Sequence, residues 1–385
     1  MPAWDVHFNT VVQAGRRDII ERIARIHAMA SVIRGIPIPP GVQHHIDALN
    51  IMRAVRGTTG IEGTEVSEDE VLEIAQAPPG RPVLGPGRGR EEQEVRNAQE
   101  MMEYVVQAIR DRPDLGVTED LVRTLHRIIT RDIPYPNNVP GQYRSHPVSA
   151  GTYRPPADVE AVRRLMAAFV DWVNAGPPRE WDPVVRALVA HFYVLSIHPF
   201  GDGNGRTARG LESLLLYQAG VNARGFYSLA NFYYRNRGEY VRLLDHVRFE
   251  TNGDLTPFVA FALRGLVEEL EAVHSEILAQ VRVISFRDYA RESLLTHGKL
   301  GSRAGERMFH LLLGLGTEPI VLKELREGAH PLSRLYRRVG LRTLARDIDF
   351  LVEHRLIMRV EGKIIANLAV MGEFTPDRAC GAGGV

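Results

Sequence analysis

The sequence contains almost no cysteine, since Cys380, in a glycine-rich tail, is the only one among 385 residues. A single cysteine excludes a disulfide framework and a cluster of metal-binding thiolates. No stretch of 18 uninterrupted apolar residues occurs, so we expect no membrane-spanning helix. Neither sign of charge is in excess, because 47 Lys and Arg residues balance 47 Asp and Glu residues. This balance argues against a uniformly basic surface, although it permits a local basic patch.

The first ten residues carry no basic segment followed by an apolar run, so we expect no secretory signal. Together with the lone cysteine, this favours a soluble cytoplasmic protein. The content of 44% hydrophobic and 24% charged residues is typical of globular domains. The length predicts two to three such domains.

The chain is predicted to be mainly α, because apolar residues recur three and four positions apart and strand-like alternation is scarce. The segment 184–197 is apolar on nearly every side, which indicates a helix buried at the centre of a bundle. Residues 78–89 are rich in Pro and Gly and are predicted to form an exposed loop, and 132–156 a second loop with an extended piece at 146–153. Helices are expected at 16–34, 44–57, 66–77, 91–110, 118–131, 157–174, 184–197, 205–219, 236–249 and 256–279. Pro37, Pro39 and Pro40 are expected to end the first of them.

The last part of the chain has a different pattern. Three helices, at 305–315, 322–326 and 341–354, precede two short strands at 356–360 and 363–367, which is the order of a winged helix-turn-helix. We therefore expect N-terminal helices in 1–90, a helical core in 91–280, a helical linker in 281–299, a winged helix in 300–370 and a disordered tail in 371–385.

The strongest local signal is the run His198-Pro-Phe-Gly-Asp-Gly-Asn-Gly-Arg-Thr-Ala-Arg209, which joins the buried helix to a new one. Gly203 and Gly205 allow the backbone to approach a ligand closely. Successive N–H groups just before a helix N-terminus form an anion-binding nest. Arg206 and Arg209 lie three residues apart and therefore on one face of the helix. Two guanidinium groups beside such a nest predict a polyphosphate site.

Two further residues give this loop its chemistry. Asp202 supplies a hard oxygen ligand of the kind that Mg²⁺ on nucleotide phosphates requires. His198 is the one group of the loop that titrates near neutrality, so it is a candidate general base for a hydroxyl nucleophile. A lone His before Pro is more often a cap or a packed core residue, and a lone Gly-x-Gly is usually a turn; the complete arrangement favours a site. It is not a Walker A loop, because the lysine is missing.

This run resembles the motif of the Fic family, His-Pro-Phe-x-Asp/Glu-Gly-Asn-Gly-Arg-x-x-Arg, at every fixed position. Pro140–Arg144 and Tyr153–Pro156 are similar to the family's flap hairpin, which holds a target side chain as an extra strand. The resemblance covers roughly residues 40–280, and a C-terminal winged helix is a common companion. One departure is that Val194 and Leu195 replace the Phe-Glu of many members.

The resemblance implies a Fic-type helical bundle with a short β-hairpin flap, and transfer of AMP from ATP to a Ser, Thr or Tyr hydroxyl with release of pyrophosphate. The implied general base is His198, and the implied Mg²⁺ ligand is Asp202. The backbone groups that would hold the β-phosphate belong to Gly203, Asn204 and Gly205. Arg206 would meet the γ-phosphate, with Arg209 in support. Tyr240 stands where members hold the base, and simple core packing of its ring is an equally good explanation.

A second motif, Thr58-Thr-Gly-Ile-Glu62-Gly63, lies upstream. Alone it is no more than a helix end stopped by glycine, but it resembles the family's inhibitory motif Ser/Thr-x-x-x-Glu-Gly/Asn. The resemblance implies that Glu62 pairs with Arg206 and occupies the place of the γ-phosphate, because two anions cannot share one guanidinium without repulsion. In some members this Glu is thought to help remove AMP, so the reverse reaction is an alternative.

Partners follow from the flap and from the last domain. A protein target is expected to dock on the flap near 145–153. Residues 300–368 hold 12 basic and 8 acidic residues, and the expected recognition helix 341–354 could enter a DNA major groove. A solvated face or a protein-docking module is the alternative, because Asp347, Asp349 and Glu353 interrupt the positive charge. A second hypothesis is therefore a DNA-binding regulator whose Fic fold only senses nucleotide. The oligomeric state stays open, a homodimer included.

Overall fold

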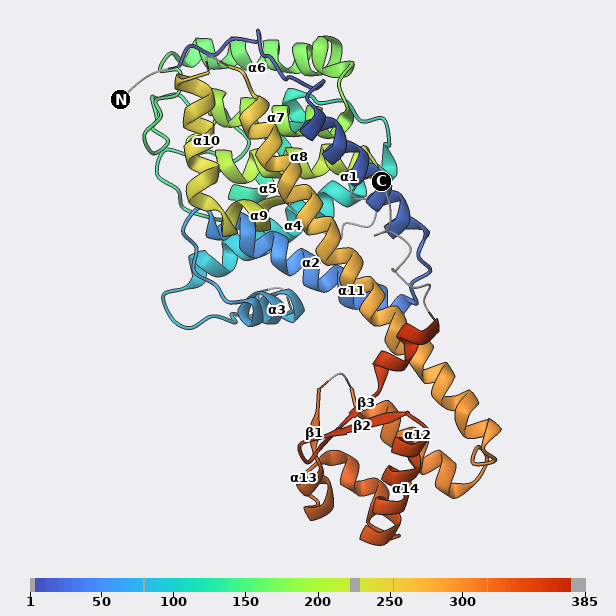
Figure 1. The fold of residues 1–385 in the computed structure, drawn as a ribbon. Helices are drawn as coiled ribbons and strands as arrows, with labels where there is room; N and C mark the ends of the chain where they lie inside the picture. Colours follow the sequence, from blue (N-terminus) through green and yellow to red (C-terminus); the bar gives the residue numbers. More distant parts are fainter. Residues whose placement is uncertain (1–3, 79, 222–228, 252, 317, 375–385) are drawn as a thin grey trace, which may run out of the picture. The chain divides into compact units, whose positions relative to one another are not determined.

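A computed structural model describes residues 4–78, 80–221, 229–251, 253–316 and 318–374. The chain divides into two compact units, Met1–Ser275 and Glu276–Val385. The described residues are mainly helical, as predicted, with one small sheet in the second unit (Figure 1). In the part of the chain that is described, none of the helices combines the length and the apolar character needed to cross a membrane.

The first unit is a bundle of helices, most of which begin within a few residues of their predicted positions. Three starts follow from side-chain caps, since Thr118, Asp158 and Asp182 accept hydrogen bonds from backbone N–H groups of the first turn. Pro40 was expected to end the first helix but opens the second, because a first-turn position needs no N–H donor. The elements are α1 (Arg17–Gly35), α2 (Pro40–Gly60), α3 (Glu68–Gln76), α4 (Gly89–Asp111), α5 (Glu119–Thr130), α6 (Val159–Ala175), the 3₁₀ helix η1 (Pro177–Arg179), α7 (Pro183–Ile197), α8 (Asn204–Gln218), α9 (Leu229–Arg235), α10 (Arg237–Phe249) and the first part of α11 (Thr256–Thr296).

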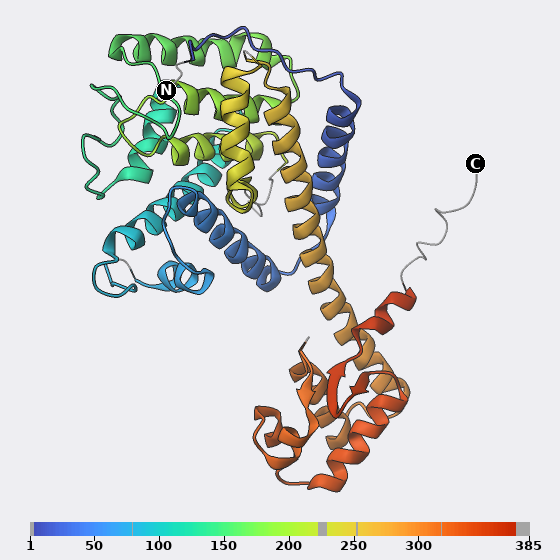
Figure 2. The ribbon, with the colours of Figure 1, turned by 60° about the vertical axis from the view of Figure 1, so that its left-hand side comes forward.

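Helix α7 lies at the centre of this unit, which confirms the prediction from its apolar sequence. From Val184 to Ile197 every residue except Arg186 is buried. It packs against α8, and α8 in turn contacts α4 and α5. Figure 2 shows α10 and the first part of α11 (yellow and gold) on another side of α7, where Phe192 contacts Phe258 and His191 contacts Tyr240. The short connection between α7 and α8 is therefore held between buried helices.

Helix α2 packs closely against α9, a seven-residue helix that the sequence periodicity did not predict. A Cβ atom at Gly57 would lie 2.6 Å from the backbone nitrogen of Asn231 and 2.7 Å from the carbonyl carbon of Ala230. Only glycine permits this approach of the two backbones. The contact matters for the site because α2 leads directly into Glu62.

The flap segment between α5 and α6 contains less regular structure than expected. The extended piece predicted at 146–153 is reduced to one β-bridge, in which Ala150 and Tyr153 exchange two backbone hydrogen bonds of 3.0 Å around a two-residue turn. The segment holds six prolines, which lack the N–H donor that a ladder requires: Pro134, Pro136, Pro140, Pro147, Pro155 and Pro156.

The second unit has its elements in the predicted order, with an additional short strand. Its three strands form an antiparallel sheet in the order β1-β3-β2, with Arg359 opposite Ile364. Its core joins Phe286 of α11 to Leu311, Leu344 and Ile364. The elements are the end of α11, α12 (Arg303–Gly314), β1 (Ile320–Val321), α13 (Leu322–Glu327), η2 (Pro331–Tyr336), α14 (Leu341–Glu353), β2 (Ile357–Val360), β3 (Lys363–Ala366) and η3 (Leu368–Phe374).

The predicted helical linker agrees with the structure, whereas the predicted tail begins too early. Helix α11 continues without a break from Thr256 to Thr296, so most of the expected linker 281–299 belongs to it. The first four residues of the expected tail, 371–374, belong to η3. The remaining residues, 375–385 with Cys380, lie outside the described part of the chain.

The contact between α2 and α9 gives a stability test. Gly57→Ala forces a methyl group into the Asn231 backbone, and overpacking of this kind costs about 1–3 kcal/mol in the free energy of unfolding. Gly41→Ala, in the first turn of the same helix, is the matched control, because a Cβ atom there meets no atom within 4 Å. Urea unfolding followed by circular dichroism measures both. Equal stability of the two variants would show that the close approach is absent.

Candidate functional site

The turn between α7 and α8 has a strained backbone. His198 adopts the left-handed region, with φ 50° and ψ 61°, where non-glycine residues are uncommon. Gly203 follows with φ 72°, and a Cβ atom there would lie 2.7 Å from Cγ2 of Thr130. Such a turn persists only where its surroundings over-determine it.

Arg144 of the flap segment holds the first half of this turn. Its backbone N–H donates to the carbonyl of Pro199 at 2.9 Å, and Nε donates to the carbonyl of His198 at 2.8 Å. Nη1 and Nη2 donate to the carbonyls of His146 and Pro156 at 2.9 and 2.5 Å. The buried guanidinium thereby joins the flap to the backbone of His198. The sequence identified Arg144 only as part of the flap motif.

Two side chains hold the second half of the turn. The amide of Asn204 accepts from the N–H of Phe200 and donates to its carbonyl, both at 2.9 Å. The ring of His126 stacks on Phe200 with 3.7 Å between centroids, and its Nδ1 accepts from the N–H of Gly141 at 2.9 Å. With Nδ1 as acceptor, the proton of the neutral ring is on Nε2, which lies 3.0 Å from the carbonyl oxygen of Asp202. Burial lowers the pKa of His126 to about 3, so the ring is neutral.

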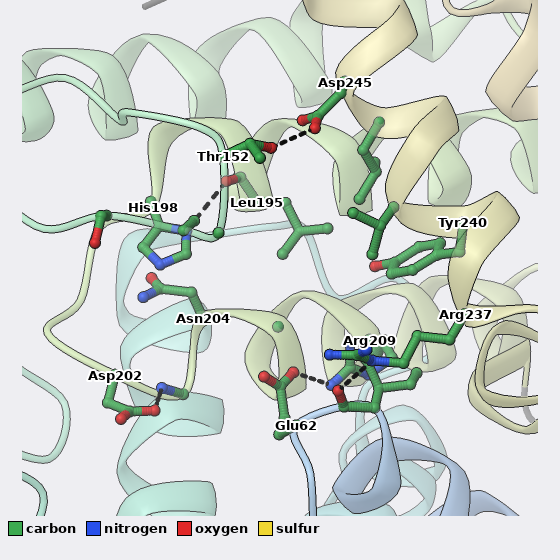
Figure 3. Close-up of a pocket in the computed structure, with 18 of the residues that line it drawn as sticks. Glu62, Thr152, Leu195, His198, Asp202, Asn204, Arg209, Arg237, Tyr240 and Asp245 are labelled. Atoms are coloured by element: carbon green, nitrogen blue, oxygen red, sulfur yellow. Dashed lines mark hydrogen bonds and ion pairs between the residues drawn. The ribbon is translucent and has the colours of Figure 1, made fainter. Parts of the chain in front are cut away.

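The turn forms one wall of a pocket of about 420 Å³ (Figure 3). The flap contributes Ser149 to Thr152 on another side, and the hydroxyl of Thr152 donates to Asp245 at 2.6 Å. Most of the predicted site residues line this pocket: Glu62, His198, Asp202, Gly203, Asn204, Gly205, Arg209 and Tyr240. Arg237, Asp245 and Arg248 of α10 line it as well and were missed, although they share a segment with Tyr240.

His198 is suited to accept a proton. Its Nδ1 lies 3.3 Å from the carbonyl of Leu195, which leaves Nε2 as the acceptor nitrogen of the neutral ring. Burial lowers the pKa of His198 to about 4, and the positive charges of Arg248 and Arg144 act in the same direction. The imidazole is therefore neutral at pH 7.

Arg209 faces the pocket and is held by the end of α2. Its Nη2 donates to Oε1 of Glu62 at 2.5 Å and to the carbonyl of Thr58 at 3.0 Å, and its Nε donates to the hydroxyl of Thr58 at 2.9 Å. Burial alone would raise the pKa of Glu62, but the charges of Arg209 and Arg206 outweigh it and hold this pKa below its usual value. The pair is thus ionised near neutral pH.

The prediction that Glu62 pairs with Arg206 was wrong. The carboxylate approaches α8 at Gly205, where a Cβ atom would lie 2.2 Å from Oε1. Gly205 and Arg209 are four residues apart and share one helix face, so Arg209 is the guanidinium that the carboxylate reaches. Gly63, the last residue of the motif, has φ 98° and ends the turn that presents Glu62.

Arg206 instead lies beneath the pocket and is only 2% exposed. Its Nη1 donates to the hydroxyl of Tyr135 at 2.6 Å and lies 3.5 Å from Glu94, while Nη2 donates to Oδ1 of Asp202 at 3.2 Å. It is not among the described residues that line the pocket, which corrects the expectation that it meets the γ-phosphate. The partners Tyr135 and Glu94 were missed, because neither belongs to a recognisable motif.

Of the two explanations offered for Tyr240, core packing is confirmed, and contact with a nucleotide base stays a prediction. Its ring stacks on Tyr233 at 4.6 Å, and its hydroxyl lies 2.8 Å from Nε2 of His191, so it is packed in the core. It also borders the pocket, where Leu195 and Leu244 add apolar surface. An apolar wall next to an aromatic edge is suited to a nucleotide base.

Asp202 is the predicted Mg²⁺ ligand. Its Oδ1 accepts from the N–H of Gly203 at 2.5 Å and from Arg206, and its side chain is 42% exposed. The described residues contain no cluster of three or more His, Cys, Asp or Glu side chains that could hold a metal ion by themselves. One accessible carboxylate fits Mg²⁺ that is bound mainly by substrate phosphates and water.

Fold and site together define a helical protein with a phosphate-type loop beside a neutral histidine. Residues 116–216 match the model of the Fic/DOC family. The fold is shared with two solved structures: a Fic family protein from Desulfovibrio desulfuricans G20 (TM-score 0.55, 20% identity, 91% of this chain and 96% of that one) and Fic-1 from C. elegans (TM-score 0.53, 21% identity, 68% and 73%). The chain thus carries a Fic/DOC family domain, as the motif predicted.

Two curated relatives are named protein adenylyltransferases. The chain is 29% identical over 202 residues to the Fic protein of Nematostella vectensis, which covers 52% of this chain and 43% of that protein. It is 28% identical over 265 residues to fic-1 of Caenorhabditis elegans, which covers 67% and 47%. The chain therefore spans less than half the length of these relatives.

The neutral state of His126 gives a prediction on stability. Because its pKa lies below the ordinary histidine value, the unfolded chain takes up the proton first as the pH falls. The stability that depends on the neutral ring is complete above about pH 6.5 and is lost progressively toward pH 3. Between pH 7 and pH 5 the free energy of unfolding should fall in wild type, because the unfolded chain takes up the proton of His126. In His126→Gln we expect this fall to be smaller by about 2 kcal/mol.

Urea unfolding at both pH values measures this difference. His45→Gln, at an exposed position of α2, is the control and should keep the wild-type pH dependence. An unchanged pH dependence in His126→Gln would contradict a buried neutral ring.

Proposed function

We propose that the protein is an adenylyltransferase that transfers AMP from ATP to a Ser, Thr or Tyr hydroxyl of a protein. The observation that carries this proposal is the placement of one pocket between a neutral His198, the N-terminus of α8 and Arg209. A base for the nucleophile and donors for the leaving group are thereby brought to the same space. The names of the curated relatives support the same activity.

The reaction follows from this placement. Nε2 of His198 takes the proton of the target hydroxyl, and the hydroxyl oxygen bonds to the α-phosphorus. The bond between the α-phosphorus and the bridging oxygen breaks, and pyrophosphate leaves with that electron pair. Its growing charge lies beside the backbone N–H groups of Gly203, Asn204 and Gly205 at the N-terminus of α8. Arg209, once released from Glu62, faces the terminal phosphate.

Asp202 would hold Mg²⁺ together with the phosphates, and Arg206 orients this carboxylate from below. When bound, Mg²⁺ neutralises phosphate charge and makes the leaving group better. The base of the nucleotide lies against Tyr240 and the neighbouring apolar wall.

The protein target docks along residues 145–153 of the flap, next to the pocket. Ala150 and Tyr153 form the one β-bridge within this described segment, so backbone groups on either side are available to an added strand. With a single cysteine in the chain, we place this reaction in the cytoplasm.

Glu62 inhibits the enzyme in this proposal. Its carboxylate lies against Gly205 and holds Arg209, where the terminal phosphate would need both the helix N-terminus and the guanidinium. Two anions cannot occupy this place together, so ATP binds productively only when Glu62 moves away.

Removal of this carboxylate should activate the enzyme. We expect Glu62→Gly to label protein from ATP with a radioactive α-phosphate about tenfold faster or more, since about 1.4 kcal/mol of competition gives a factor of ten. Glu65→Gly is the matched control, because Glu65 is exposed three residues further along and makes no side-chain ion pair within the described residues.

The double variant Glu62→Gly/His198→Ala should label at background level. Equal labelling by wild type, Glu65→Gly and Glu62→Gly would refute the inhibition. Labelling by the double variant would refute His198 as the base.

The lowered pKa of His198 predicts the pH profile. An active base must be neutral, so activity is lost only as the pH falls toward the pKa of His198, about 4. We expect kcat/KM of Glu62→Gly for ATP to stay level from pH 8 to 6, whereas an ordinary histidine would lose about three quarters of its neutral form at pH 6. Circular dichroism at each pH controls for unfolding. A midpoint near the ordinary histidine value would contradict the effect of burial.

A further inference from the structure

The second unit presents five exposed arginines in one short stretch that runs from η2 into the first half of α14. They are Arg334, Arg337, Arg338, Arg342 and Arg346. Within the described part of the chain, none of the five forms an ion pair, whereas three other arginines of this unit do. Arg307 pairs with Asp347, Arg355 with Glu373 and Arg359 with Asp349. We call the five residues the arginine surface.

The acids in α14 weaken this surface less than the sequence suggests. Asp347 is 2% exposed and lies 2.7 Å from Arg307, so it belongs to the core side of the helix. Asp349 is exposed, but Arg359 of β2 donates to it at 3.0 Å. Among the described acids of α14, Glu353 is the one that forms no ion pair, and it lies at the end of the helix, seven residues from Arg346.

Helix α14 has a clear buried face and a clear outer face. Leu344, Ile348 and Leu351 are buried in the core of the unit. Arg342 and Arg346 are four residues apart and both exposed, so they lie together on the outer face. Arg337 and Arg338 lie in the turn just before the helix, and Arg334 lies in η2. The positive groups thus flank the start of one exposed helix.

This arrangement selects the chemistry of its partner. Like charges that lie unpaired side by side repel each other, and the repulsion is relieved by a partner with regularly spaced negative groups. The planar guanidinium matches phosphate oxygens two at a time. The apolar side chains of Val339 and Leu341, 42% and 59% exposed, lie between the arginines and suit contacts with thymine methyl groups.

The shape distinguishes between nucleic acids. A short helix α13, a connection that contains the 3₁₀ helix η2, and α14 precede the β2–β3 hairpin. In winged helices this order places the N-terminal half of the last helix in a groove. The major groove of B-form DNA admits a helix, whereas that of duplex RNA is too deep and narrow. We propose that the arginine surface binds duplex DNA, with the start of α14 in the major groove and the arginines on the flanking phosphates. This binding is independent of the proposed AMP transfer.

The test uses the full chain and a fluorescein-labelled DNA duplex of about 30 base pairs, followed by fluorescence anisotropy. If three to five phosphates are neutralised, the logarithm of affinity falls against the logarithm of salt with a slope of about −2.7 to −4.5. Affinity then drops about 40- to 500-fold between 50 and 200 mM NaCl. Arg338→Ala/Arg342→Ala should reduce the steepness by about 2 and weaken binding at every salt concentration.

Arg287→Ala/Arg291→Ala is the matched control, because both arginines are exposed on α11 in the same unit and the loss of charge is equal. This control should bind DNA as wild type does, and unlabelled duplex RNA should compete poorly. The absence of DNA binding at 50 mM NaCl would overturn the proposal. Equal loss in the two double variants, or competition by RNA as strong as by DNA, would also overturn it. Circular dichroism of both variants excludes unfolding as the cause.

Discussion

The short turn between two buried helices is the constraint on which the rest of the site depends. Helices α7 and α8 cannot shift without repacking the core, so the chain must reverse within residues 198–203. It does so with His198 and Gly203 at positive φ, and Arg144, His126 and Asn204 fix the carbonyl and N–H groups in between. The result is a histidine and a helix N-terminus held on rigid elements at fixed separation, which is what preorganised chemistry requires.

The two arginines of α8 have different roles because one is buried below the pocket and the other faces it. Arg206 and Arg209 share one side of the helix, but Arg206 is surrounded by Tyr135, Glu94 and Asp202, whereas Arg209 faces the pocket. The groups that hold Arg209 come from one short segment at the end of α2, which Arg237 secures through the carbonyl of Ile61 at 3.0 Å. Control of the pocket's cation therefore rests on a segment outside the residues that match the family model.

Local patterns in the sequence predicted what local physics decides. The apolar run of α7 predicted that this helix is buried, and Thr118 predicted where α5 begins. The glycine-rich run predicted the phosphate-type turn before α8. Helical spacing could not decide whether Glu62 reaches Arg206 or Arg209, because it fixes the face of a helix and not the approach of another segment. His126 was missed because it lies in neither motif, and its contacts with Phe200 and Gly141 join segments that are separate in the sequence. The flap hairpin was overestimated because its prolines were not weighed against the ladder.

Counting charged residues over the whole chain does not show which of them a ligand can meet. The formal net charge is zero, and in the second unit acids interrupt the basic residues of α14 in sequence. In space, Asp347 and Asp349 are paired with Arg307 and Arg359, so they do not neutralise the arginines next to them along the chain. The same reasoning applies in the pocket, where Glu62 pairs with Arg209 and not with Arg206, the residue that the sequence motif suggested. Which charges are free to meet a ligand is decided by pairing across the fold, and a surface can be strongly basic in a protein whose charges sum to zero.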